Sequence, residues 1–401
     1  MKISGKGRRL NFTIDAPPSK SVYHRELICR FLSGDTKCLA ENADDNNDIR
    51  ATKSCLKSLS DARASFSEEA VLHPGESGST IRFLIPVAAA FLLGEKKCSE
   101  RVIFRTEGRL FDRPFGELAD AMKPHGILIE KDEETRSILV TGNMTPGKYV
   151  IDGSVSSQYI SGLLMALPLF SSESTIEVTG QMKSVHYIEL TLDALKKYST
   201  PASLNGNVFS PSFGGYKGDV SGNFKVEGDW SNGAFLLCLK KWSDIEVQNL
   251  DPDSRQGDKA IVDFLRFAEE GHSGEVTWDC TDTPDIAPYM ATVAPFLFDK
   301  ITLTGTGRLR IKESDRVMAV REQLAAIGVK TTETEDTLTV YRYEGTAPEE
   351  ISLSSYNDHR MAMCAILIAV ILEAEVEIDD IKCLDKSFPE FREIIRRELM
   401  P

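Results

Sequence analysis

Apolar residues gather into six predicted helices, each of which begins in a polar or glycine-rich turn. These helices start near Ser21, Ser79, Ser157, Asn232, Asp285 and Asp358. The stretches 78–94 and 157–170 are apolar on nearly every side. Because a helix without a polar face must be buried on all faces, the pattern predicts helices in the interior of the protein.

The segments between these helices have two faces. Residues 115–125, 188–198, 258–269 and 314–327 carry an apolar stripe and a charged stripe, as outer helices do. Residues 127–130 with 137–141, and 329–333 with 337–341, alternate between apolar and polar and predict hairpins. The sequence therefore predicts an α/β fold with buried helices and outer sheets, repeated with a period of roughly 55 to 80 residues. Three repeats lie on each side of a boundary near 226–229, after the glycine-rich stretch 203–228.

Composition indicates an ordinary globular protein. The chain has 401 residues, of which 41% are hydrophobic and 27% charged, enough for two domains with substantial cores. The start of the chain lacks a secretory pattern, and the longest apolar run, Met361 to Leu372, is shorter than the about 18 residues of a membrane span. The eight cysteines include no Cys-x-x-Cys pair. We expect a cytoplasmic protein without a membrane partner, and the net charge of −14 argues against nucleic acid as a partner.

Basic residues crowd one predicted helix start. Five of the seven residues in 310–316 are charged, and Ser314 or Asp315 is a plausible N-cap. Lys312 would then lie just outside the helix and Arg316 in its first turn. Since a helix N-terminus is itself partially positive, cations there destabilise it unless an anion binds. Alternatively, Glu313 and Asp315 neutralise the cluster without any ligand.

The same arrangement recurs at other predicted helix starts. Small, hydroxyl-bearing and basic residues occur together in 17–25, 75–82, 154–158 and 357–360, and two more arginines, Arg109 and Arg113, lie in 107–114. Hydroxyl groups and cations bind oxyanions, and small residues let the backbone approach a ligand. Because the protein is acidic overall, these local basic clusters favour a small polyanionic ligand.

These motifs, in this order and spacing, resemble those of the enolpyruvyl transferases, in particular the 3-phosphoshikimate 1-carboxyvinyltransferase (EPSP synthase) family. The motifs are Lys20-Ser21 with Arg25, Gly78-Ser79 with Arg82, Arg109 before Arg113-Pro114, 156–158, Asp285, 312–316, 358–360 and 386–389. The resemblance covers nearly the whole chain.

The resemblance implies a two-domain inside-out α/β fold in which each domain has three βαβαββ units. Residues 1–18 with 228–401 would form the C-terminal lobe and 19–227 the N-terminal lobe, with the active site in the cleft between them. The implied reaction transfers the enolpyruvyl group of phosphoenolpyruvate to the 5-hydroxyl of shikimate 3-phosphate and releases phosphate. It is a step in the biosynthesis of chorismate and the aromatic amino acids. No cofactor or metal is implied, and we expect a monomer whose partners are these two small molecules.

The resemblance also assigns residues to the two substrates. Shikimate 3-phosphate would contact Lys20, Ser21, Arg25, Ser156, Ser157, Gln158, Ser184, Asp285 and Lys312. Phosphoenolpyruvate would contact Lys20, Gly78, Arg82, Arg109, Gln158, Arg316, Arg360 and Lys386.

For catalysis, the resemblance implies Asp285 as the base at the 5-hydroxyl. Lys312 and Glu313 would carry the proton to and from the methylene carbon, and Lys20 and His359 join the catalytic set. His359 could be an acid, a proton shuttle or a packing residue.

Simpler interpretations of individual residues remain open. Ser156 and Ser157 could be an N-cap pair, Asp285 could cap its own helix, and Tyr187 could belong to the helix core. Glu76 and Arg308 depart from residues found in many family members, which affects the expected hydrogen bonds around the substrates.

Three other functions compete with the implied one. Enolpyruvyl transfer to UDP-N-acetylglucosamine would be expected to use a cysteine in the loop before Arg113-Pro114, and 108–114 has none. RNA 3′-phosphate cyclisation on a related fold is disfavoured by the acidic composition. A non-catalytic anion-binding protein would have no need of Asp285 with Glu313.

Overall fold

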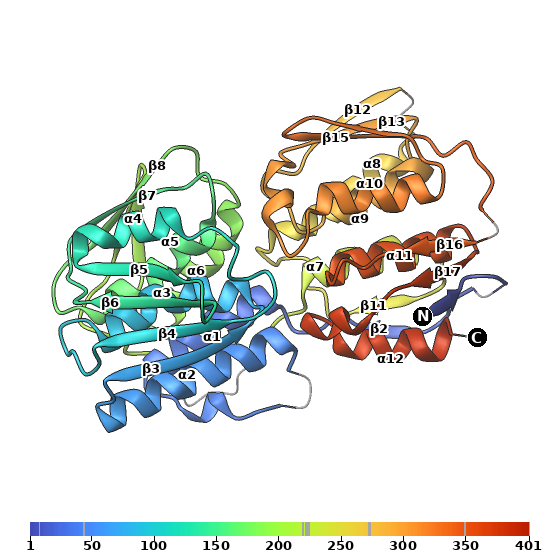
Figure 1. The fold of residues 1–401 in the computed structure, drawn as a ribbon. Helices are drawn as coiled ribbons and strands as arrows, with labels where there is room; N and C mark the ends of the chain where they lie inside the picture. Colours follow the sequence, from blue (N-terminus) through green and yellow to red (C-terminus); the bar gives the residue numbers. More distant parts are fainter. Residues whose placement is uncertain are drawn as a thin grey trace. The chain divides into compact units, whose positions relative to one another are not determined.

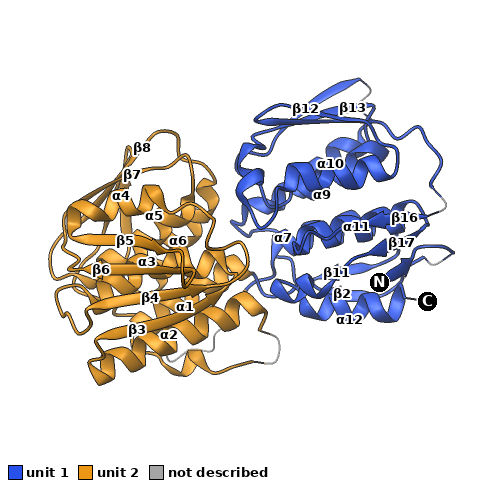
Figure 2. Ribbon diagram, in the orientation of Figure 1, with its two compact units in different colours: residues 1–19, 227–401 blue, residues 20–226 orange. Residues whose placement is uncertain are grey.

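The structure, a computed structural model, describes residues 1–7, 9–42, 45–218, 220, 225–271, 274–348 and 350–400. Contacts within it divide the chain into two compact units (Figure 2). Unit 1 consists of Met1–Ser19 and Glu227–Pro401, and unit 2 consists of Lys20–Val226. Part of the glycine-rich stretch 203–228 lies outside the described residues.

Unit 2 is built on three central helices, α1 (Lys20–Leu32), α3 (Gly78–Leu92) and α5 (Ser157–Ala166). Nearly every residue of α3 and α5 is buried, as the continuous apolar pattern predicts. The α5 helix is shorter than expected, because Pro168 falls in a single 3₁₀ turn, η3 (Leu167–Leu169), that ends the segment.

Three helices with one buried face pack around this centre. They are α2 (Asn47–Ser65), α4 (Gly116–Met122) and α6 (Val185–Lys197), with 3₁₀ turns η1 (Lys37–Leu39) and η2 (Lys123–His125). Pro124 lies in η2, so the helix expected to reach His125 stops at Met122.

Two four-stranded sheets are described in unit 2. The first has the order β3 (Glu69–Gly75), β4 (Arg101–Thr106), β6 (Ser137–Gly142) and β5 (Ile127–Asp132). The second has the order β7 (Lys148–Asp152), β8 (Thr175–Thr179), β10 (Val208–Pro211) and β9 (Ala202–Asn205). The hairpin predicted from alternation is the antiparallel β5–β6 pair, in which Ile129 faces Val140.

Unit 1 repeats the plan with buried helices α7 (Trp230–Lys240), α9 (Ala287–Val293) and α11 (His359–Ile371) (Figure 1). Its other helices are α8 (Ile261–Glu269), α10 (Arg316–Ala326) and α12 (Pro389–Glu398). Four 3₁₀ segments connect them: η4 (Gly257–Ala260), η5 (Ala294–Phe296), η6 (Gly307–Ile311) and η7 (Lys382–Lys386).

The sheets of unit 1 are less regular than an exact repeat predicts. One has four strands, in the order β12 (Glu275–Asp279), β13 (Lys300–Thr304), β15 (Thr337–Tyr341) and β14 (Thr331–Glu333). The others contain strands from the chain start: β1 (Lys2–Ser4) pairs with β17 (Glu375–Ile378) beside β16 (Ile351–Leu353), and β2 (Thr13–Asp15) pairs with β11 (Glu246–Gln248). The first residues of the chain thus complete two sheets of unit 1.

The predicted fold class, α/β with buried helices, is confirmed. Each unit has a single main hydrophobic cluster, formed largely by its central helices and the inward residues of its strands. In the described part of the chain, every helix is too short or too polar to cross a bilayer.

Candidate active site

The starts of four helices in unit 2 are joined by hydrogen bonds. Lys20, the first residue of α1, donates from Nζ to Oδ2 of Asp48 in the first turn of α2, at 2.9 Å. The Thr52 hydroxyl of α2 lies 2.7 Å from the Thr80 hydroxyl of α3. The Ser79 hydroxyl of α3 accepts from Nε2 of Gln158 in α5, at 2.8 Å. Because helix N-termini are partially positive, this arrangement concentrates positive potential in one part of unit 2.

Gly78 lies against two guanidinium groups. A Cβ atom at this position would be 2.4 Å from Nη1 of Arg113 and 3.2 Å from Nη1 of Arg82. Arg82 is 5% exposed and donates to Oε1 of Gln158 at 2.9 Å. The absence of a side chain at residue 78 therefore allows two buried arginines to approach the start of α3.

The two arginines of the 107–114 loop differ in burial. Arg109, which the resemblance assigned to phosphoenolpyruvate, is an exposed residue, whereas Arg113 is 8% exposed and touches Gly78. Arg113, which the motif contains but the assignment to phosphoenolpyruvate left out, is thus an additional candidate beside Arg109.

Three serines assigned to the acceptor phosphate lie at helix starts. Ser156 is the N-cap of α5, its hydroxyl accepting from the Gln158 amide at 3.3 Å, and Ser157 is the first residue of that helix. Ser184 precedes α6 with φ 55° and ψ 47°, and it is 1% exposed. A left-handed conformation is uncommon for a residue other than glycine, and such strain occurs often at ligand sites. The N-cap interpretation of Ser156 is correct and is compatible with anion binding at the same helix end.

Arg25 connects three helices through hydrogen bonds and is also a candidate substrate-binding residue. Its guanidinium donates to the hydroxyls of Thr191 and Ser161 and to the carbonyls of Ser21 and Tyr187. These bonds join α1 to α5 and α6, and Arg25 is 2% exposed. Burial lowers the pKa of Arg25 to about 10, so the side chain remains charged at neutral pH.

In unit 1, the charged stretch 310–316 folds back on the start of α11. Asp315 caps α10 by accepting from the Met318 amide at 3.0 Å, which makes Arg316 the first residue of the helix. Ser314, the alternative cap, donates instead to Oδ2 of Asp358 at 3.0 Å. Arg310 lies 3.6 Å from Asp315, as neutralisation within the cluster predicts, and it also pairs at 2.8 Å with Glu333, which lies outside the cluster.

Arg316 is the centre of the unit 1 cluster. It is 1% exposed and donates to Oδ2 of Asp358 at 2.8 Å, to Oε2 of Glu313 at 2.8 Å and to Oδ1 of Asp285 at 3.0 Å. Burial alone would raise the pKa of Asp358, but Arg316 outweighs it and lowers that pKa to about 2. Arg316 therefore favours the ionised form of Asp358 and holds the carboxylates of Glu313 and Asp285 beside it.

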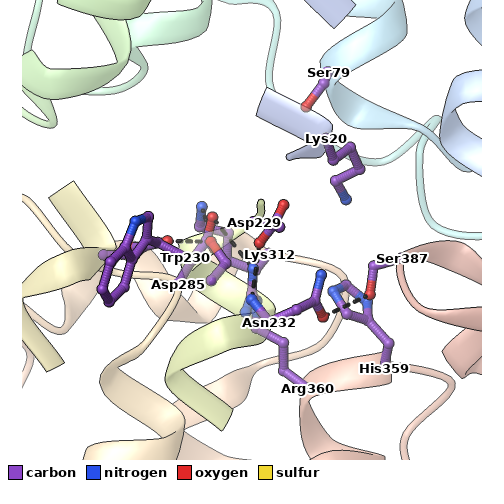
Figure 3. Close-up of polar contacts among 12 residues, drawn as sticks. Lys20, Ser79, Asp229, Trp230, Asn232, Asp285, Lys312, His359, Arg360 and Ser387 are labelled. Atoms are coloured by element: carbon purple, nitrogen blue, oxygen red, sulfur yellow. Dashed lines mark hydrogen bonds and ion pairs between the residues drawn. The ribbon is translucent and has the colours of Figure 1, made fainter. Parts of the chain in front are cut away.

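Asp285 lies beside three cations rather than on its own helix end (Figure 3). Its carboxylate is 3.5 Å from Nζ of Lys312, 3.0 Å from Nη1 of Arg316 and 3.7 Å from Nη2 of Arg360. The N-cap position of α9 belongs to Ile286. Burial would raise the pKa of Asp285, but Lys312, Arg360 and Arg316 together hold it well below its usual range.

The pKa of Lys312 is lowered as well, but for a lysine this shift favours the neutral form. Burial, together with the positive charges of Arg316 and Arg308, lowers its pKa to about 8, although Asp285 acts in the other direction. A lysine with a pKa near neutrality can both give and accept a proton at physiological pH. Asp285 and Lys312 thus form a partly buried acid–base pair.

The remaining expected residues of unit 1 lie at the same end of its helices. His359 and Arg360 are the first two residues of α11, and both are buried. Lys386 is 7% exposed at the end of η7, next to Ser387, whose hydroxyl is 3.5 Å from Oδ1 of Asn232. Figure 3 shows Asn232, His359, Arg360 and Ser387 near one another at these helix starts.

One buried acid near this cluster was missed by the sequence analysis. Asp258 in η4 is 3% exposed and accepts a hydrogen bond from the Ser231 hydroxyl of α7. Burial and the charge of Asp285 raise the pKa of Asp258 to about 6. Its position on the charged face predicted for residues 258–269 gave no sign that it would be buried.

The chemistry of the two clusters favours anions and proton transfer. Unit 2 presents buried arginines, hydroxyls and helix starts, and unit 1 adds an ionised carboxylate beside a lysine. Among the described residues, histidines, cysteines and acids do not gather in any group of three or more that could hold a metal ion.

Comparisons with known proteins agree with this chemistry. The family of EPSP synthase (3-phosphoshikimate 1-carboxyvinyltransferase) matches residues 5–395. The chain is 33% identical to the 3-phosphoshikimate 1-carboxyvinyltransferase of Clostridium kluyveri, over 98% of this chain and 96% of the relative. It is 31% identical to that of Clostridioides difficile, over 96% and 94%.

Solved structures agree on the fold. The EPSP synthase of Acinetobacter baumannii superposes with a TM-score of 0.71 at 18% identity, over 99% of this chain and 98% of the other. The enolpyruvyl transferase NikO from Streptomyces tendae has a TM-score of 0.65 at 12% identity, over 100% and 99%. The chain belongs to the EPSP synthase family.

Proposed function

We propose that the clusters of both units act on one pair of substrates, phosphoenolpyruvate and shikimate 3-phosphate. The family's reaction is enolpyruvyl transfer between these molecules, with release of phosphate. The observation that carries the proposal is the pair of Asp285 and Lys312 among buried arginines. This pair supplies an ionised base and a titratable acid beside cations that neutralise phosphate and carboxylate groups.

In this proposal, unit 2 holds the acceptor. Ser156, Ser157 and Ser184 bind the 3-phosphate, because helix starts and hydroxyl groups suit a phosphate. Lys20, Ser21, Arg25 and Gln158 surround the ring and its carboxylate. The left-handed backbone of Ser184 supports this assignment, since such strain occurs often at ligand sites.

The donor lies among the arginines. Gly78, Arg82 and Arg113 approach phosphoenolpyruvate from unit 2, with Arg109 at the edge of the site. From unit 1, Arg360 and Lys386 make the direct charge pairs. Arg316 remains beside the substrate, but because it already donates to three carboxylates, its main role is to fix Asp285, Glu313 and Asp358.

The chemical steps follow from these positions. Asp285 takes the proton of the 5-hydroxyl as that oxygen bonds to C2 of phosphoenolpyruvate. Lys312, assisted by Glu313, gives a proton to the methylene carbon, which forms a tetrahedral ketal phosphate. Removal of a proton from the new methyl group then expels phosphate and restores the enol ether double bond.

A substrate-dependence assay tests the proposal. We expect the purified protein to release phosphate only when phosphoenolpyruvate and shikimate 3-phosphate are both present. Shikimate without its phosphate should support little turnover, because the serines of unit 2 would have no phosphate to bind. Release with UDP-N-acetylglucosamine as acceptor would instead identify the sister reaction, and binding of both substrates without turnover would identify an anion-binding protein.

A further inference from the structure

Arg360 has a neutral partner on one side of its guanidinium group and the base on the other. Its Nη1 donates to the hydroxyl of Tyr289 in α9 at 3.1 Å, while Nη2 lies 3.7 Å from Oδ2 of Asp285. The carbon of the guanidinium group is 5.7 Å from the centre of the Tyr289 ring. The arginine therefore lies between a close phenol oxygen and a more distant carboxylate.

Tyr289 is itself held rigidly. It is fully buried, its ring packs 5.9 Å from that of Phe235, and its hydroxyl lies 3.0 Å from Sδ of Met363 in α11. When the hydroxyl hydrogen points at this sulfur, the oxygen lone pairs are left to accept from Arg360. Burial raises the pKa of Tyr289, so the phenol stays neutral across the working range of pH.

A neutral acceptor has a specific consequence for a binding arginine. A carboxylate in the place of the phenol would add a further negative charge beside the guanidinium group, whereas a hydroxyl fixes the direction of the group without adding charge. Sites of this kind depend on supporting residues that hold the contacting side chain in place.

We propose that Tyr289 is a positioning residue that fixes the direction of the Arg360 guanidinium group for phosphoenolpyruvate, and so sets the affinity for this substrate. This inference rests on the proposed function, because it takes phosphoenolpyruvate as the ligand of Arg360. Without the hydroxyl, Nη1 loses this hydrogen bond, and the guanidinium group is held less firmly in its present direction.

The test compares Tyr289→Phe with Tyr343→Phe. The matched control removes a tyrosine hydroxyl of the same unit that is buried and has no hydrogen-bond partner among the described residues. We expect Tyr289→Phe to raise KM for phosphoenolpyruvate about five- to fiftyfold, with KM for shikimate 3-phosphate changed less than about twofold. Tyr343→Phe should change neither value.

A double variant distinguishes a positioning role of Tyr289 from a general loss of structure around the site. In Arg360→Lys, the shorter side chain lacks the guanidinium Nη1, so adding Tyr289→Phe should have little further effect on KM for phosphoenolpyruvate. An unchanged KM in Tyr289→Phe, an equal rise for both substrates, or the same effect in the Arg360→Lys background would overturn the inference. If Tyr289→Phe does not fold, Tyr289→Met replaces it in the same comparison.

Phosphate release by the wild-type protein tests the proposed function, and the variants test the role of Tyr289. Absence of phosphate release with both substrates would reject the proposed function, whereas normal release with an unaltered Tyr289→Phe variant would reject only the role of Tyr289. Titration calorimetry with phosphoenolpyruvate then decides the inference independently of turnover. Weaker binding by Tyr289→Phe supports the role of Tyr289, and equal binding rejects it.

Discussion

Arg316 and Lys312 in unit 1 have carboxylate partners, whereas Arg25 and Arg82 in unit 2 have neutral partners. In unit 1, Arg316 donates to three carboxylates, and Lys312 lies beside the carboxylate of Asp285. In unit 2, the hydrogen bonds of Arg25 go to two hydroxyls and two backbone carbonyls, and Arg82 donates to the amide of Gln158.

This difference corresponds to two tasks, anion binding and proton transfer. Neutral partners orient a cation and leave its charge available, which suits the binding of phosphate and carboxylate groups. Carboxylates packed against cations acquire perturbed pKa values, which suits proton transfer. Arg25 and Arg82 of unit 2 are thus suited to binding, and Asp285 with Lys312 of unit 1 is suited to proton transfer. Lys20 of unit 2, which pairs with Asp48, and Arg360 of unit 1, which donates to Tyr289, depart from this division. The predictions below test it.

The largest effect should come from the base of unit 1. Asp285→Asn keeps the shape of the side chain but cannot accept a proton, and we expect kcat to fall by about 10²- to 10⁴-fold. The exposed Asp263→Asn in the same unit is the control and should retain normal turnover. A near-normal kcat for Asp285→Asn in the phosphate-release assay would remove Asp285 from its assigned role.

The next effect concerns pH. Lys312 acts as a donor only when protonated, and its pKa of about 8 means that the donor is present below pH 8 and lost as pH rises through that value. We expect kcat/KM to decline above about pH 8, whereas an unperturbed lysine would titrate near 10.5. Lys312→Ala should lower turnover at least about a hundredfold. Lys312→Arg, which does not titrate in this range, should abolish the decline; its persistence would assign the titration to another group.

In unit 2, Arg113 and Arg109 of the 107–114 loop allow a direct comparison of a buried and an exposed arginine. Arg113→Ala removes a buried guanidinium group against Gly78 and should raise KM for phosphoenolpyruvate by about 10- to 100-fold. Arg109→Ala removes an exposed side chain and should raise it by less than about threefold. Steady-state kinetics at saturating shikimate 3-phosphate measures both values. The reverse order would restore Arg109 as the main ligand.

The smallest effect is expected at Ser184. Replacement by Ala or Gly removes the hydroxyl, so each should weaken binding of shikimate 3-phosphate by about five- to tenfold. The left-handed backbone favours glycine, so Ser184→Gly should be more stable than Ser184→Ala by about 0.5 to 1 kcal/mol in thermal unfolding. Equal stabilities would mean that the left-handed conformation stores no strain.

Part of the fold followed from local patterns. Continuous apolar runs predicted the buried helices α3 and α5, and alternation predicted the β5–β6 hairpin. Proline positions changed the ends of two helices, which the apolar pattern alone did not anticipate.

The sequence by itself determined the fold class, the family and the identity of most basic residues at helix starts, because these depend on local order and spacing. Only the tertiary structure decided which side chains meet. It buried Arg113 and left Arg109 exposed, showed that Arg316 donates to three carboxylates, and brought Tyr289 against Arg360. Such pairings join residues far apart in the chain, and the burial that sets their pKa values exists only after the chain has packed.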